Sequence, residues 1–298
     1  MSPPSENANV AKQRVLIYGA AGLIIAGLGY MGFVYPRDMR PDAGTSLGIA
    51  RLHLGLAEIF VGNKNPKAAQ FLAEHLAQAG AALDDAEAVA PGLPITSEFR
   101  GFKAWIAGDF EEAAAQYRKV RSASKDPDMR QKMTVNLAQI AIATGHAGKA
   151  REELENTPEG ERSVAWHLAA ARAWQFDGAE ESRSAELAAA VRAAKNDSRM
   201  LRCVADASYR FGDAIALSTY EQIEDKDAAT WYRIARLKIT SGDTDSARSA
   251  LVQLREKDPG LLDRWVERDK KFWDQYREAG LLKREPVGDA AAASGPGK

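Results

Sequence analysis

Apolar side chains recur at every third or fourth position along most of the chain, which is the spacing of one face of an α-helix. Alanine, leucine, glutamate and arginine dominate between residues 41 and 283, and the alternation typical of β-strands is nearly absent there. Short breaks that contain glycine separate the helical patterns. The sequence therefore predicts an all-α domain over residues 41–283, with flexible tails at residues 1–14 and 284–298.

The region from Val15 to Tyr35 differs from the rest because it has no polar face. It contains 21 consecutive uncharged residues, which as a helix span roughly 31 Å, close to the hydrocarbon thickness of a bilayer. This predicts one transmembrane helix over residues 15–35. A cleavable signal peptide ending near Gly27–Gly29 is the alternative, but its apolar core would be only about 7 to 15 residues long. The length therefore favours an uncleaved anchor.

Charge gives this span no clear orientation, since Lys12 and Arg14 precede it and Arg37, Arg40 and Arg51 follow it. A short basic tail ahead of a long C-terminal domain is typical of a signal anchor with its N-terminus in the cytoplasm. In a bacterium, this predicts a single-pass inner-membrane protein with its helical domain in the periplasm.

Small residues form one stripe of the predicted span, at Gly19, Gly22, Ala26 and Gly29. Such a stripe lets a second transmembrane helix approach closely, because helix association in lipid depends on packing. Glycine is also common in transmembrane helices in general, so both interpretations remain open.

Two glycine motifs match functional patterns by spacing. Gly27–Gly32 fits the G-x-G-x-x-G pattern of dinucleotide-binding folds, but nothing downstream of it alternates as strands do. Gly44–Gly48 fits the G-x-S-x-G nucleophile elbow, but no strand precedes it. We interpret both matches as accidental, and a nucleotide-dependent enzyme is the least favoured function.

The glycine-containing breaks are periodic. Their separations are 46, 37, 33, 34 and 30 residues, for breaks at Gly62, Gly108, Gly145, Gly178, Gly212 and Gly242. Spacings that cluster near 34 predict a repeated helix–turn–helix unit.

The residues around these glycines resemble the tetratricopeptide repeat (TPR) family. The best copy has Trp231, Ala235, Gly242, Ala247 and Pro259 at the family's spacing. Two further copies carry the same kinds of residue, at Gly101, Gly108, Ala113 and Tyr117, and at Ala138, Gly145, Ala150 and Leu154.

Other copies depart from the family pattern. After Gly178 the first alanine in the expected role is Ala185, seven residues later, which predicts a two-residue insertion. The offsets after Gly212 are irregular, and the second helix after Gly62 is overlong. The resemblance thus covers residues 41–260 unevenly.

The resemblance implies an α-solenoid of stacked helix pairs. Small residues such as Ala113, Ala138 and Ala235 would let the two helices of a pair pack closely, and the turn glycines would adopt positive φ. No pair can bury its apolar face alone, so each must stack on its neighbours. An amphipathic helix over residues 261–283, rich in aromatic side chains, is expected to cap the last pair.

The family also implies a concave groove, lined by the first helix of each pair, that binds a peptide or protein partner. Carried over to this chain, the groove residues are Glu98, Phe102, Trp105, Lys132, Val135, Gln139, Ile142, Arg172, Phe176, Arg202, Asp206, Tyr209, Arg210, Tyr232, Arg236 and Ile239. Arginine and tyrosine in such a groove suit an acidic or C-terminal carboxylate group. The alternative is that these arginines are solvated or pair with Asp206 and nearby glutamates of the chain itself.

Composition narrows the function further. Forty basic against 41 acidic side chains give a net charge of -1, which argues against a nucleic-acid binder. The four histidines, His53, His75, His146 and His167, show no metal-binding spacing, and we expect no metal or cofactor. The single cysteine, Cys203, is expected to be a small buried side chain.

These observations favour a non-catalytic, membrane-tethered scaffold that binds other proteins, as an accessory subunit of a bacterial envelope complex. A structural subunit held in a membrane complex by its span is the alternative. Capture of a partner by the helical domain alone would favour the scaffold, and capture that requires the span would favour the structural subunit.

Overall fold

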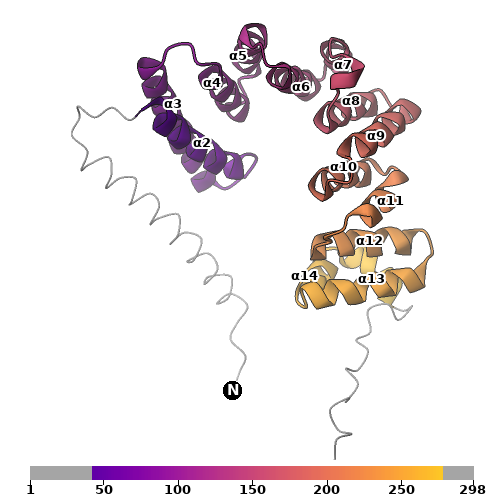
Figure 1. The fold of residues 1–298 in the computed structure, drawn as a ribbon. Coiled ribbons are helices and arrows are strands. Elements are labelled where there is room, and N and C mark those ends of the chain that lie inside the picture. The colour runs from indigo at the N-terminus through magenta and orange to yellow at the C-terminus, as the bar shows by residue number, and fades with distance from the viewer. Residues whose placement is uncertain (1–41, 278–298) are drawn as a thin grey trace, which may run out of the picture. The chain divides into compact units, whose positions relative to one another are not determined.

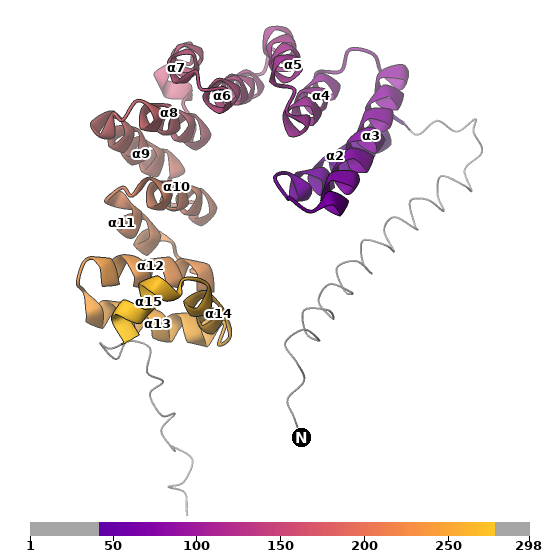
Figure 2. The same cartoon turned by 180° about the vertical axis from the view of Figure 1, so that it is seen from behind.

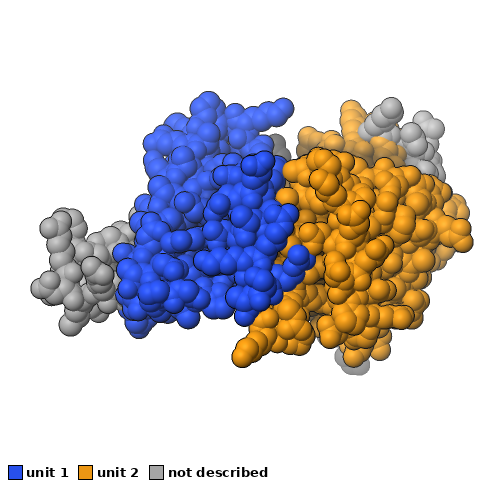
Figure 3. Space-filling view, turned by 90° about the horizontal axis from the view of Figure 1, so that it is seen from above, with its two compact units in different colours: residues 1–123 blue, residues 124–298 orange. Residues whose placement is uncertain are grey.

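A computed structural model describes residues 42–277, in which all regular secondary structure is helical. This part of the chain contains fourteen α-helices and one short 3-10 helix (Figure 1). It divides into two compact units, coloured separately in Figure 3, with the boundary between Ala123 and Ser124. Each unit is a set of antiparallel helical hairpins, so the prediction of an all-α, TPR-like fold is confirmed for the described residues.

Unit 1 contains two hairpins, made of α2 (Ala43–Phe60), α3 (Pro66–Val89), α4 (Pro94–Ala107) and α5 (Phe110–Ala123). Local sequence explains where the helices start: the Asp42 side chain accepts a hydrogen bond from the Thr45 amide, and Pro66 occupies the first turn of α3. Its core is formed by side chains from α2, α3 and α4, including Leu54, Leu83 and Ile106. As expected, α3 is overlong, with 24 residues.

Unit 2 contains four hairpins and two short C-terminal helices. The first two hairpins are α6 (Pro127–Ala143) with α7 (Ala147–Glu155), and α8 (Val164–Phe176) with α9 (Glu180–Ala194), with η1 (Glu159–Glu161) between them. The next two are α10 (Ser198–Phe211) with α11 (Ile215–Gln222), and α12 (Ala228–Thr240) with α13 (Thr244–Lys257). The chain continues as α14 (Leu261–Arg268) and α15 (Lys270–Arg277), which Figure 2 shows beside α13.

The glycines and alanines that carry the repeat resemblance have the conformation and the burial that the pattern predicts. All six turn glycines have φ between 68° and 83°, the left-handed conformation that ends a helix at little steric cost. The alanines Ala113, Ala138, Ala150, Ala235 and Ala247 are completely buried between paired helices.

The copy that follows Gly178 has no insertion, so that prediction is wrong. Helix α9 begins two residues after its turn glycine, as α5, α7 and α13 do. The position that holds alanine in those copies is therefore occupied by Arg183, which is buried. Its guanidinium donates to Gln175 Oε1 at 2.6 Å and pairs with the buried Asp213 at 3.5 Å, so a buried ion pair replaces a small side chain.

The C-terminal cap is two helices, not one. The backbone leaves the helical region at Asp269 (φ −120°, ψ 47°), which separates α14 from α15, and residues 278–283 lie outside the described part. The break lets Leu262 and Trp273 both reach the core of unit 2. The prediction that the aromatic side chains here serve the core is confirmed for Trp273, whereas the burial expected for Cys203 is wrong, because that side chain is exposed.

Several predictions fall outside the described residues. They are the transmembrane helix over residues 15–35, its stripe Gly19, Gly22, Ala26 and Gly29, and the tails at 1–14 and 284–298. Between residues 42 and 277, none of the helices combines the length and the apolar character needed to cross a membrane.

Candidate partner-binding surfaces

The first helices of the early hairpins in unit 2 contact one another, α6 with α8 and α8 with α10. Their outward faces carry four of the predicted groove residues that remain available to solvent. These are Lys132 on α6, Arg172 and Phe176 on α8, and Arg210 on α10. Phe176 is 58% exposed, a large fraction for an aromatic side chain.

Two of these basic residues have no partner in the described part of the chain. Neither Arg172 nor Arg210 forms an ion pair or a side-chain hydrogen bond with a residue between 42 and 277. The other groove positions of α6 are less accessible, since Gln139 is half-buried and Val135 and Ile142 belong to the core.

Two other predicted groove arginines are engaged within the fold. Arg202 on α10 pairs with Asp227 Oδ2 at 2.5 Å and donates to the Asp225 carbonyl at 2.9 Å. Arg236 on α12 pairs with Asp269 Oδ2 at 2.5 Å, and its guanidinium lies 4.1 Å from the ring centroid of Phe272. The chain's own carboxylates therefore bind these two guanidinium groups, but the partners are Asp227 and Asp269 and not the Asp206 and glutamates of the alternative interpretation.

The predicted groove residues of α12 lie beneath the C-terminal helices. Tyr232 is buried, its ring centroid is 4.2 Å from that of Trp265, and its hydroxyl accepts a hydrogen bond from Trp273 Nε1 at 3.1 Å. Ile239 is also part of this core. Helices α14 and α15 thus cover the surface that the family pattern would leave open to a ligand.

A carboxylate and two tyrosines form a polar cluster beside that core. Asp206 accepts a hydrogen bond from Tyr220 at 2.6 Å and pairs with Arg233. The ring of Tyr209 lies 6.4 Å from that of Tyr220. Burial raises the pKa of both tyrosines, and the hydrogen bond to Asp206 raises the pKa of Tyr220 further.

In unit 1 the predicted groove residues are buried or pack against the core. Phe102 and Trp105 are half-buried against the cluster around Leu54 and Ile106. Glu98 is buried near Tyr117, whose pKa is raised by burial and by the Glu98 carboxylate.

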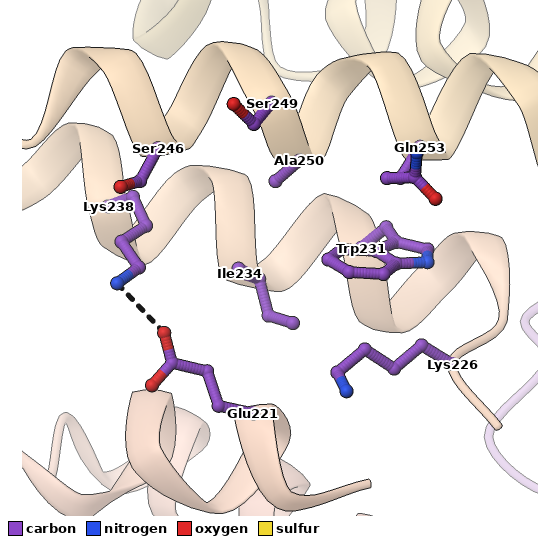
Figure 4. Close-up of a pocket in the computed structure, with 9 residues that line it drawn as sticks. All are labelled: Glu221, Lys226, Trp231, Ile234, Lys238, Ser246, Ser249, Ala250 and Gln253. Carbon is purple, nitrogen blue, oxygen red and sulfur yellow. Dashed lines mark ion pairs between the residues drawn. The ribbon is translucent and has the colours of Figure 1, made fainter. Parts of the chain in front are cut away.

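An open cleft of about 360 Å³ lies between α11, α12 and α13 (Figure 4). Its lining is Glu221, Lys226, Trp231, Ile234, Lys238, Ser246, Ser249, Ala250 and Gln253. Lys226 Nζ lies 5.5 Å from the Trp231 ring centroid, and Lys238 Nζ bonds Glu221 Oε1 at 2.8 Å. The Glu221 bond raises the pKa of Lys238, so this ammonium stays protonated.

The cleft offers an aromatic surface, two ammonium groups and, from α13, hydroxyl and amide side chains. This mixture suits a side chain of another polypeptide better than a small charged substrate, because the site is open. Sequence reasoning missed it, since Trp231 looked like a signature residue of the fold. The spacing of Ser246, Ser249 and Gln253, which places polar groups on one face of α13, is the signal that could have found it.

Within residues 42–277, no three histidine, cysteine, aspartate or glutamate side chains come together as a metal site. The described chain is an all-α protein of helical hairpins, and two solved structures are similar to it. A tetratricopeptide repeat protein from Parabacteroides merdae is 15% identical, with a TM-score of 0.43 over 66% of this chain and 81% of the other. PilF of Pseudomonas aeruginosa is 16% identical, with a TM-score of 0.45 over 76% and 99%.

No family model matches the chain, and no curated protein matches it in sequence. At this level of identity and overlap, neither solved structure says what this chain binds.

Proposed function

We propose that this protein is a non-catalytic, membrane-tethered scaffold that binds a partner polypeptide on the outward faces of α8 and α10. The observation that supports this most directly is the combination of Arg172, Arg210 and Phe176 on two contacting helices. The partner segment is acidic and carries an apolar side chain. In a bacterium, the anchor would be in the inner membrane and the hairpins in the periplasm.

The residues that would bind the partner's carboxylates are the arginines that the described part of the chain does not pair. Arg202 and Arg236 are held by Asp227 and Asp269, so a ligand would have to displace those carboxylates. Arg172 and Arg210 have no such partner among the described residues and can form bidentate bonds to a ligand carboxylate. Phe176 supplies the apolar contact that exposed charges alone do not give.

Charge reversal tests this surface. The variant Arg172→Glu with Arg210→Glu is expected to abolish capture of the partner, measured by affinity purification in mild detergent with mass spectrometry. The control is Arg118→Glu with Lys119→Glu on α5, which makes the same change in net charge on exposed residues of unit 1. Equal capture by the two variants would contradict the proposal.

The anchor requires its own test. Carbonate extraction of vesicles should leave the intact chain with the membrane, and its release would remove the tethering part of the proposal. The variant Gly22→Leu with Gly29→Leu then separates two roles of the span. Loss of partner capture in this variant, with the α8–α10 surface intact, would favour the alternative of a structural subunit held by its span.

A further inference from the structure

The turn between α2 and α3 exposes a group of apolar side chains. Ile59 is 70% exposed, Val61 is 51% exposed and Phe71 is 42% exposed. Phe60 links them, because its ring is stacked 5.5 Å from that of Phe71. We call residues 59–71 the hairpin tip. Water-exposed apolar side chains gathered at one site mark an interaction surface more often than scattered ones do.

The charges of the hairpin tip have one sign. It carries Lys64 and Lys67, both exposed, and it contains no aspartate or glutamate. The flanking carboxylates are Glu58 and Glu74, and the latter accepts a hydrogen bond from Gln70. Apolar side chains beside lysines match the boundary of an anionic bilayer, where acyl chains lie under negative headgroups.

The shape of unit 1 also favours a flat surface over a bound peptide. Helix α3 has 24 residues and α4 has 14, or about 36 Å against about 21 Å. The connection to α4 is at the opposite end of α3, so the hairpin tip projects past α4 (Figure 2). A projecting end of this kind can insert into an interface.

We propose that the hairpin tip docks on an anionic membrane surface, with Ile59, Val61 and Phe71 inserted among the headgroups and Lys64 and Lys67 against their charges. The apolar and basic side chains of the tip are observed directly, whereas the distance between the tip and the membrane rests on the proposed anchor. Residues 36–42 extend at most about 24 Å, and α2 returns over about 27 Å. A span that ends at Tyr35 would therefore let the tip meet the same membrane.

A fluorophore on the tip tests this in the full-length chain. We would replace the exposed Cys203 with serine, introduce Ile59→Cys, label it with an environment-sensitive dye and reconstitute the protein in vesicles. The vesicles contain phosphatidylcholine, with or without phosphatidylserine, and a nitroxide-labelled lipid as quencher. The control label is Val252→Cys, at an apolar position of unit 2 that is 44% exposed.

The expected result is strong quenching at residue 59, a blue shift that increases with phosphatidylserine, and neither change at residue 252. Each lysine near an anionic surface raises the ratio of bound to unbound protein roughly fivefold. The variant Lys64→Gln with Lys67→Gln should therefore lower the ratio of docked to undocked tip roughly 25-fold. Arg118→Gln with Lys119→Gln should leave it unchanged.

Equal quenching at residues 59 and 252 would overturn the proposal. An unchanged ratio of docked to undocked tip in the variant Lys64→Gln with Lys67→Gln would also overturn it. Failure of the anchor is a separate outcome, because carbonate would then release the chain. The dye at residue 59 would still report whether the released protein docks its tip on added vesicles.

Discussion

Gly101 lies inside α4, where the ring of Tyr117 from α5 leaves no room for a methyl group. A Cβ atom built on Gly101 would be 2.6 Å from Cε1 of Tyr117, and that ring is buried. We expect Gly101→Ala to destabilise the protein by about 1–3 kcal/mol, because overpacking outweighs the better helix propensity of alanine. Chemical denaturation would measure it.

Gly55 provides the matched control for this prediction. It lies inside α2, in the same unit, and a Cβ atom there would meet nothing within 4 Å. Gly55→Ala should therefore stabilise the protein by about 0.5–1 kcal/mol. If both variants were stabilising, the close contact between Gly101 and Tyr117 would be absent in solution.

Two histidines in unit 1 give the fold a pH dependence. The Nδ1 atoms of His53 and His75 are 3.1 Å apart and buried, so one ring must donate and the other accept. Burial, and then the neighbouring His75, lowers the pKa of His53 below its ordinary value near 6.5. The folded state therefore favours the neutral ring.

The sign of the effect follows from proton binding. Below about pH 6.5 the unfolded chain takes up a proton at His53 that the folded chain does not. The stability associated with the neutral ring is therefore present above that pH and is lost as pH falls toward the lowered folded pKa. Thermal unfolding should show a larger decrease in Tm between pH 7.5 and pH 5 for the wild type than for His53→Leu with His75→Leu. Parallel pH profiles would refute this role of the pair.

At the scale of elements, the short C-terminal helices complete the core of unit 2. Trp273 of α15 is 0% exposed and donates to the hydroxyl of Tyr232 on α12. We expect Trp273→Ala to cost about 3–5 kcal/mol, the usual range for removing a buried aromatic side chain. Hydrogen exchange should rise in α12 and α13.

Val252→Ala is the control for that measurement, because the Val252 side chain is 44% exposed on α13. Its effect should stay within about 0.5 kcal/mol. Similar exchange in the two variants would mean that α15 does not stabilise the unit.

Some of these elements could be predicted from the sequence, because their signals are local. A turn glycine or a small residue such as Ala247 is dictated by its own hairpin, so repeat spacing was enough to locate it. Arg183 could not be predicted, since its burial depends on Asp213, thirty residues away along the chain. Helix α15 covers Tyr232 only because the helix breaks at Asp269. The apolar pattern of residues 261–283 does not reveal this break.

The candidate surfaces were predicted only in part, for the same reason. The pattern identifies which positions line the first helices, but it cannot show which arginines the chain itself will bind. Arg202 and Arg236 find carboxylates in the following hairpin or the C-terminal helices, whereas Arg172 and Arg210 do not within the described residues. Such partly exposed pairs bring little stability each.

At the scale of the molecule, each unit has a core of its own. The clusters around Leu54 and Leu83 contain only residues of unit 1, and those around Trp166, Leu187 and Leu251 contain only residues of unit 2. The first helix of unit 2 is also capped from within the unit. The Asp126 side chain accepts from the Asp128 amide at 3.0 Å, and Arg130 donates to the Lys125 carbonyl at 2.9 Å.

Unit 2 should therefore fold without unit 1. A fragment of residues 124–283 begins at the boundary and keeps α6 with its cap, so we expect a helical circular dichroism spectrum and a single cooperative unfolding transition. A fragment of residues 197–283 is the control, because it separates Leu187 and Ala190 of α9 from α10 and α11, the following helices that α9 contacts. The control should be less helical per residue and unfold without a clear transition, since a repeat needs its neighbour to close its core. A longer fragment that melts no more cooperatively than the shorter one would show that the two units form a single folding unit.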